Sequence, residues 1–140
     1  MGPTQRVPCV TIRACALIII AVHTALMCLG LRRTVVLLGR ISARWTLPNM
    51  HGRSPHRLAT PAHIARQVAD VAAFFPGRIV CLDQSLVLWF LLRRRHLVPN
   101  LRIGIRTLPF GAHAWVDLAG FPINEDPERV RLLQILWTQA

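Results

Sequence analysis

Apolar residues dominate the first part of the chain. Residues 14–31 are apolar apart from His23 and Thr24, and arginines flank this run at position 13 and at positions 32 and 33. The run is long enough to span a membrane as a helix. Its pattern equally fits a helix that packs on protein or lies at a membrane surface. A secretory signal fits less well, because arginines and not a small-residue cleavage site follow the run.

The pattern changes between Thr46 and Pro61, where helix breakers are dense and apolar residues are few. This composition predicts a linker. Residues 1–58 are therefore expected to form an apolar helical segment, interrupted by arginines, together with the linker. Residues 59–140 are expected to form a separate folded core.

Two helices are predicted at the start of this core. Thr60 suits an N-cap and Pro61 suits a first helical position, which predicts a helix to about Phe74. A second helix is predicted from about Cys81 to His96. Its residues 86–92 are all apolar, and a helix that is apolar on every side is normally buried in the middle of a fold.

Strands are predicted after this helix. Residues 101–106 alternate between apolar and basic or glycine positions, as in a half-buried strand. Residues 112–117 and 121–125 are predicted to pair as a hairpin. A last helix is predicted over residues 127–137, with Val130, Leu133 and Leu136 on one side.

The composition narrows the class of protein and its partners. Hydrophobic residues make up 53% of the chain and charged residues 16%, which excludes a disordered chain. The net charge of +11 comes entirely from arginine and favours acidic partners. The four cysteines show no paired spacing typical of a zinc site, so no metal is expected and the thiols indicate a reducing, cytoplasmic compartment.

Cys81 and His113 are the candidates for chemistry. Cys81 begins the predicted buried helix, where the free N–H groups and positive end of the helix favour a thiolate. His113 lies in a predicted strand between two alanines, and an imidazole can take a thiol proton and later protonate a leaving amine. Trp115, on the same strand face, is expected to shield the site or to line a substrate groove, with core packing as the alternative.

An acid that orients His113 is predicted from the geometry of the hairpin. A three-residue loop, Leu118–Gly120, would place Glu125 opposite His113. A two-residue loop, Ala119–Gly120, would place Asp126 there. The first is preferred because the final glycine suits the three-residue loop, and Asp126 stays the alternative.

These residues resemble a known family, the lasso-peptide leader peptidases, which are McjB C-terminal-like cysteine proteases of the transglutaminase-like superfamily. The resemblance covers roughly residues 60–127. It is carried by Pro76-Gly77, Cys81-Leu82, Ser85-Leu86, residues 91–94, Leu101-Arg102-Ile103-Gly104, residues 112–116 and Ile123-Asn124-Glu125. One departure is Asp83, because a neutral residue is common near that point of the family.

The resemblance implies an α+β fold of the papain or transglutaminase type, with the cysteine helix packed on a small antiparallel sheet. It implies a catalytic triad of Cys81, His113 and Glu125 and cleavage of a leader from a lasso-peptide precursor, with no metal or other cofactor. It also implies a separate small leader-recognition protein and a lasso cyclase as partners.

Two rival functions remain open. Transglutaminase-like acyl transfer would use the same acyl-enzyme with an amine in place of water. A non-catalytic, arginine-rich module would instead bind membrane or nucleic acid. Nucleic acid is not expected, because no aromatic residues are interleaved with the arginines. Membrane contact through residues 14–40 stays an open expectation.

Overall fold

A computed structural model describes residues 11–44, 60–75 and 79–140 of the chain. Four helices come first: α1 (Ile12–Leu29), α2 (Leu31–Arg44), α3 (Pro61–Ala73) and α4 (Cys81–Arg93). They precede strands β1 (Pro99–Thr107), β2 (Phe110–Leu118), β3 (Phe121–Pro122) and β4 (Gln134–Gln139), with the short helix α5 (Pro127–Arg131) before β4. The strands form one antiparallel sheet in the order β3-β2-β1-β4.

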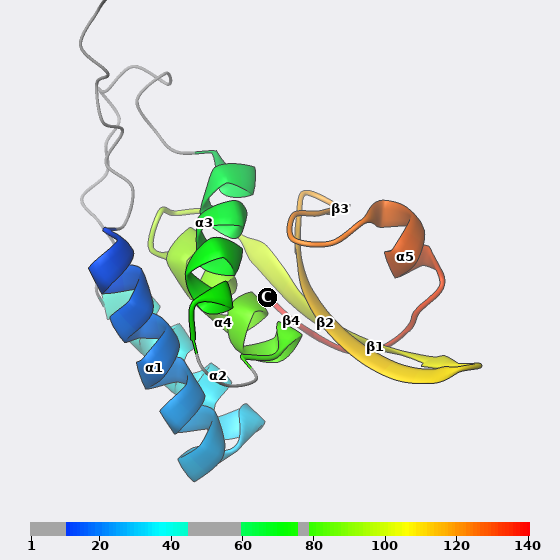
Figure 1. Cartoon of the computed structure of the whole chain (residues 1–140), viewed down its shortest axis with the longest axis horizontal. Helices are drawn as coiled ribbons and strands as arrows, with labels where there is room; N and C mark the ends of the chain where they lie inside the picture. Colours follow the sequence, from blue (N-terminus) through cyan, green and yellow to red (C-terminus); the bar gives the residue numbers. More distant parts are fainter. Residues whose placement is uncertain (1–10, 45–59, 76–78) are drawn as a thin grey trace, which may run out of the picture.

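Helices α1 to α4 gather on one side of the molecule, and the sheet extends from them (Figure 1). Helix α4 lies between the two layers, since it contacts α1, α2 and α3 as well as β1 and β2. Nine of its 13 residues are buried, as its all-round apolar sequence predicts. The predicted α+β class is therefore confirmed, with the cysteine helix packed on a small antiparallel sheet. The helix ends at Arg93 and not at His96, which lies in a turn with a φ of 60°.

Helix α1 is buried on one face only. Cys15, Ile19, Val22 and Leu26 recur at helical spacing and enter the same hydrophobic core as α4. The rest of α1 is largely exposed, including Leu17 and Met27. By length and composition alone, α1 could cross a membrane, and it is the one helix of the described residues for which this holds. It turns into α2 at Gly30, whose φ of 76° favours glycine.

Helix α3 begins as the sequence predicts. The Thr60 side chain caps it by accepting a hydrogen bond from the His63 N–H at 3.2 Å, and Pro61 occupies the first turn. Most of the predicted linker falls on residues 45–59, outside the described part of the chain. The predicted boundary at residue 58 falls there too. The hydrophobic core nevertheless includes residues from both sides of it, from Cys15 to Val116.

The end of the chain differs from the prediction. The helix expected over residues 127–137 stops at Arg131, and residues 134–139 form β4, which pairs with β1. Ile135, Trp137 and Thr138 suit a strand, and the unpaired edge of β1 offers them hydrogen bonds that a helix would forgo. The predicted strand over 121–125 is also too long, because residues 123–125 form bends.

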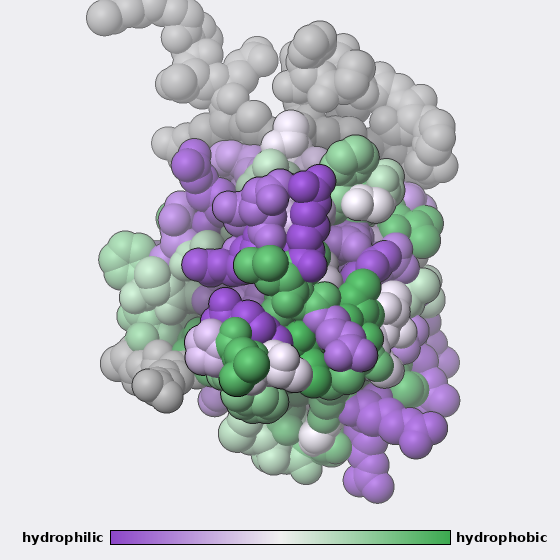
Figure 2. Space-filling view, turned by 90° about the vertical axis from the view of Figure 1, so that its right-hand side faces the viewer, coloured by the Kyte–Doolittle hydropathy of each residue, from purple (hydrophilic) through white to green (hydrophobic). Residues whose placement is uncertain are grey.

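The side of the molecule turned to the right in Figure 1 presents a mixed surface. Hydrophobic side chains gather in its middle and hydrophilic side chains border them (Figure 2). Large exposed hydrophobic residues of the sheet and its connections are Leu108, Phe110, Phe121, Leu132 and Leu136.

Candidate active site

Cys81 is the first residue of α4, and its side chain is half-buried. The first amides of a helix have no partner within the helix, so the backbone at this position can donate to an oxyanion. The other cysteines differ in exposure. Cys15 is buried, and burial raises the pKa of its thiol, while Cys28 is exposed. Cys9 lies outside the described residues.

His113 lies in β2 and forms an ion pair with Glu125. The contact joins His113 Nε2 to Glu125 Oε2, and the side chains are 26% and 12% exposed. Glu125 also accepts a hydrogen bond from the Asp126 N–H at 2.9 Å, and Arg129 Nη1 lies 3.5 Å from Glu125 Oε1. The carboxylate is thus fixed from several sides, and it holds one nitrogen of the imidazole.

The structure brings Glu125 into contact with His113, as predicted. However, the hairpin register from which this contact was predicted is wrong. Leu118 pairs with Phe121, so the loop consists of two residues, Ala119 and Gly120. Both have positive φ, 50° and 84°, as in the two-residue turns that match strand twist.

Continued strand pairing in this register would bring Asp126 opposite His113. The chain instead leaves the sheet after Pro122, and the bends over residues 123–125 carry Glu125 to the imidazole. Asp126 has another task. Its Oδ1 accepts a hydrogen bond from the Glu128 N–H at 2.9 Å and caps α5.

Ser85 and Asn124 connect the cysteine helix to the histidine strand. The Ser85 hydroxyl donates to the Ala114 carbonyl at 2.9 Å, and Asn124 Nδ2 lies 3.0 Å from that hydroxyl. Asn124 Oδ1 accepts from the Val116 N–H at 2.8 Å. Neither residue is a candidate for chemistry by its sequence pattern. A usable signal was Ser85 itself, a polar residue directly before a run of seven apolar residues in a buried helix.

These contacts determine where Cys81 lies relative to His113. Ser85 lies one helical turn after Cys81, on the same face of α4, and it binds the residue that follows His113. Within the described residues, no hydrogen bond joins the Cys81 sulfur to the imidazole. Strand alternation turns His113 away from the face on which Val116 enters the core, toward Glu125. The structure therefore brings the histidine and the acid together and places the cysteine helix at the edge of the same strand.

Trp115 does not line a groove in this structure. It is fully buried, and its Nε1 donates to Asp117 Oδ1 at 2.9 Å. Asp117 in turn pairs with Arg102 at 2.7 Å. A Cβ atom at Gly104, directly across from His113, would lie 3.0 Å from the Trp115 ring. Trp115 therefore supports the histidine strand from within, which is the core-packing alternative.

A second histidine–carboxylate pair lies at the start of α4. His23 Nδ1 of α1 is 2.9 Å from Asp83 Oδ1, and Asp83 Oδ2 accepts from the Val80 N–H at 3.2 Å. The Asp83 side chain is only 1% exposed. Asp83 thus caps the helix that begins with Cys81 and ties it to α1. This explains an acid at the position where the sequence departs from the family pattern, and no local pattern could have paired residues 60 positions apart.

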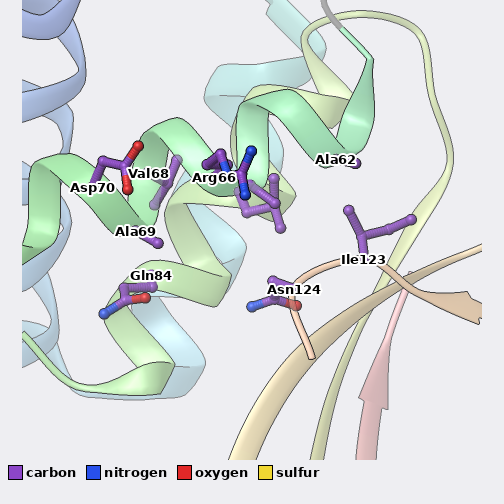
Figure 3. Close-up of a pocket in the computed structure, with 10 residues that line it drawn as sticks. Ala62, Arg66, Val68, Ala69, Asp70, Gln84, Ile123 and Asn124 are labelled. Atoms are coloured by element: carbon purple, nitrogen blue, oxygen red, sulfur yellow. The ribbon is translucent and has the colours of Figure 1, made fainter. Parts of the chain in front are cut away.

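A pocket opens beside the candidate site, between α3, α4 and residues 123–124 (Figure 3). Its volume is about 370 Å³. Among the described residues, no group of three or more histidine, cysteine or acidic side chains is arranged to hold a metal ion.

Comparisons with known proteins point to one family. Residues 25–138 match the family model described as the transglutaminase-like superfamily. The chain is also 32% identical over 76 residues to the microcin J25-processing protein McjB of Escherichia coli. The matched region covers 52% of this chain and 36% of McjB. The chain thus spans well under half of that relative, and no solved structure matches it.

The resemblance drawn from the sequence is thereby confirmed, and the chain is similar to a lasso-peptide leader peptidase. The family match extends from the second half of α1 to β4 and includes Cys81, His113 and Glu125. On this match, the chain belongs to the transglutaminase-like superfamily.

Proposed function

We propose that this protein is a cysteine peptidase that removes the leader from a ribosomally made lasso-peptide precursor. The observation that carries the proposal is the ion pair between His113 and Glu125, beside the strand edge on which the Cys81 helix docks. The similarity to McjB supports the choice of substrate, since the printed name of that protein describes the processing of microcin J25.

In the proposed mechanism, the Cys81 thiolate attacks the carbonyl carbon of the scissile peptide bond. Backbone N–H groups at the start of α4 stabilise the oxyanion. The C–N bond then breaks, and protonated His113 gives its proton to the leaving amine. Water attacks the thioester, His113 accepts a proton from it, and the cleaved acid leaves. Glu125 holds the imidazole and stabilises its cation during both steps.

The mechanism requires the Cys81 sulfur to approach the imidazole at the edge of β2. Catalytic hydrogen bonds are often long in unliganded enzymes and shorten when substrate binds. The imidazole faces away from the core side of β2, so it must turn around the strand edge to reach the sulfur. Ser85 and Asn124 hold α4 at that edge, one turn from Cys81. Neither a metal ion nor a nucleotide takes part in any step.

The proposal includes a separate small leader-recognition protein that delivers the precursor and a cyclase that uses the released peptide. Exposed apolar residues such as Phe110, Phe121 and Leu132 offer surfaces for such partners. The chemistry needs a reduced thiol, so we place the reaction in the cytoplasm. The apolar outer side of α1, with Arg32 and Arg33 at its end, suits contact with an anionic membrane surface.

The test is a cleavage assay with the precursor and the recognition protein, analysed by mass spectrometry. The parent enzyme should release a leader fragment, and Cys81→Ala should release none. Cys28→Ala is the matched control, because it removes an exposed thiol far along α1 and should cleave at the parental rate.

Other products would distinguish the rival functions. A precursor that gains the mass of an added amine without being cut would indicate acyl transfer and overturn the peptidase proposal. Salt-sensitive binding to vesicles or nucleic acid that persists in Cys81→Ala, without any cleavage by the parent, would indicate a non-catalytic basic module.

A further inference from the structure

The pocket between α3 and α4 has one wall made of small residues. Ala62, Ala65 and Ala69 of α3 line this wall, opposite Leu88 of α4. Ile123 closes one end (Figure 3). A wall of alanines leaves a hollow that larger side chains would fill. Ligand pockets usually measure about 300–1,000 Å³, so a volume of about 370 Å³ suits a part of a peptide and not a whole large ligand.

The pocket lies beside the candidate active site, although none of the three candidate catalytic residues lines it. Gln84 and Leu88 line it, and they lie three and seven residues after Cys81, which places all three on one stripe of α4. Asn124, also in the lining, directly precedes Glu125. The pocket thus borders both the helix that carries the sulfur and the segment that carries the acid.

The chemistry of the lining favours an apolar guest. Both amide side chains of the lining have partners within the protein: Asn124 bonds Val116 and Ser85, and Gln84 donates to the Ile79 carbonyl at 3.4 Å. Arg66 and Asp70 are exposed, one helical turn apart on α3, where water competes for both charges. Apolar burial against the alanines, Leu88 and Ile123 is therefore the main attraction that the pocket offers.

We propose that this pocket binds an apolar side chain of the substrate peptide, within three residues of the scissile bond, and so determines which peptides are cut. The inference rests on the proposed peptidase function for the identity of its guest. It adds a specificity-determining site formed by Ala65, Ala69 and Leu88. A peptide that lies across Cys81 can place one side chain between α3 and α4 while its carbonyl faces the sulfur.

The first experiment measures binding without cleavage. N-acetyl-leucine N-methylamide is titrated into the ¹⁵N-labelled Cys81→Ala variant, with N-acetyl-glycine N-methylamide as the matched probe. The leucine probe should shift the amide signals of Ala65, Ala69 and Asn124 saturably. A dissociation constant of about 1 mM is expected for a ligand of this size. The glycine probe should shift them at least tenfold more weakly.

Ala69→Leu fills the pocket, and Ala73→Leu introduces the same side chain one turn later on α3, at an exposed position outside the lining. Binding of the leucine probe should be lost in the first variant and kept in the second. Equal shifts by both probes, or leucine binding that survives Ala69→Leu in a folded protein, would overturn the proposal.

The second experiment separates this inference from the proposed function. The parent enzyme and the recognition protein are incubated with precursors randomised around the cleavage site, and the cleaved bonds are read by mass spectrometry. We expect a preference for Leu, Ile, Val or Phe at one position near the cut, which Ala69→Leu changes to Gly or Ala at that same position. An unchanged preference refutes the pocket assignment. Absence of any Cys81-dependent cut refutes the peptidase proposal, and the probe titration still decides whether the pocket binds apolar side chains.

Discussion

The two histidine–carboxylate pairs beside α4 have opposite surroundings. In the pair of His113 and Glu125, both side chains keep some contact with solvent, and the acid lies in a bend after a short strand. In the pair of His23 and Asp83, the histidine is 38% exposed, whereas the acid is 1% exposed and also caps the helix. A group that transfers protons must be reachable by substrate, whereas a buried acid that caps a helix fixes the backbone. We therefore expect the first pair to serve the chemistry and the second to serve the architecture.

The largest expected effect is on the first pair. His113→Ala should lower the rate of leader release by about 10²- to 10⁴-fold, since it removes the imidazole that moves the proton in the proposed mechanism. The fold should persist, because the imidazole is partly exposed and Arg129 still accompanies Glu125. Leader release is followed by mass spectrometry and folding by circular dichroism. His23→Ala is the matched control, and an equal loss of rate in that variant would erase the contrast.

A smaller effect is expected from the acid of the same pair. Glu125→Gln should slow cleavage roughly 10- to 100-fold, because the amide keeps the shape but cannot stabilise the imidazolium. Asp126→Asn should leave the rate unchanged, since asparagine also caps helices well and α5 stays capped. Initial rates of leader release at saturating precursor, measured for both variants, test these two expectations. A greater loss in Asp126→Asn than in Glu125→Gln would transfer the orienting role to Asp126.

The smallest effect on the chemical step, and the largest on stability, is expected from the second pair. Asp83→Ala should lower the free energy of unfolding by roughly 1–3 kcal/mol, because it leaves the Val80 N–H and His23 without their partner. His23→Ala should cost less, since solvent screens a histidine that is 38% exposed. Glu128→Ala, which removes a surface ion pair with Arg131, should change stability by less than about 0.5 kcal/mol.

Urea unfolding followed by tryptophan fluorescence measures these differences. If Asp83→Ala unfolds at the parental urea concentration but no longer releases leader, the second pair belongs to the chemistry as well, and the comparison fails.

The sequence predicts best where the signal is local. Thr60 and Pro61 mark the start of α3, and the unbroken apolar run of α4 predicts its burial, because caps and periodicity depend on neighbouring residues. Cys81 and His113 were also found from local patterns, with help from the family resemblance, whereas Glu125 was predicted from a hairpin register that is wrong. Their catalytic roles stay a prediction.

The failures arise where distant parts of the chain decide. Residues 134–139 form a strand because β1 offers an unpaired edge, which the spacing of Leu133 and Leu136 does not reveal. The bends after Pro122 carry Glu125 to His113, whereas continued pairing from the observed two-residue loop would place Asp126 there. The contact of His23 with Asp83 depends on how α1 packs on α4, so no pattern within either helix predicts it.

The shared hydrophobic core limits how this protein can be divided into fragments. A fragment of residues 59–140 would keep every candidate catalytic side chain, yet it would strip α4 of the cover that Ile19, Val22 and Val35 provide. The apolar residues of α4 exposed in this way would favour aggregation of such a fragment. A shortened form of the protein must therefore retain α1 and α2. Swaps of the amino-terminal region between homologues must exchange the matching residues of α4 at the same time.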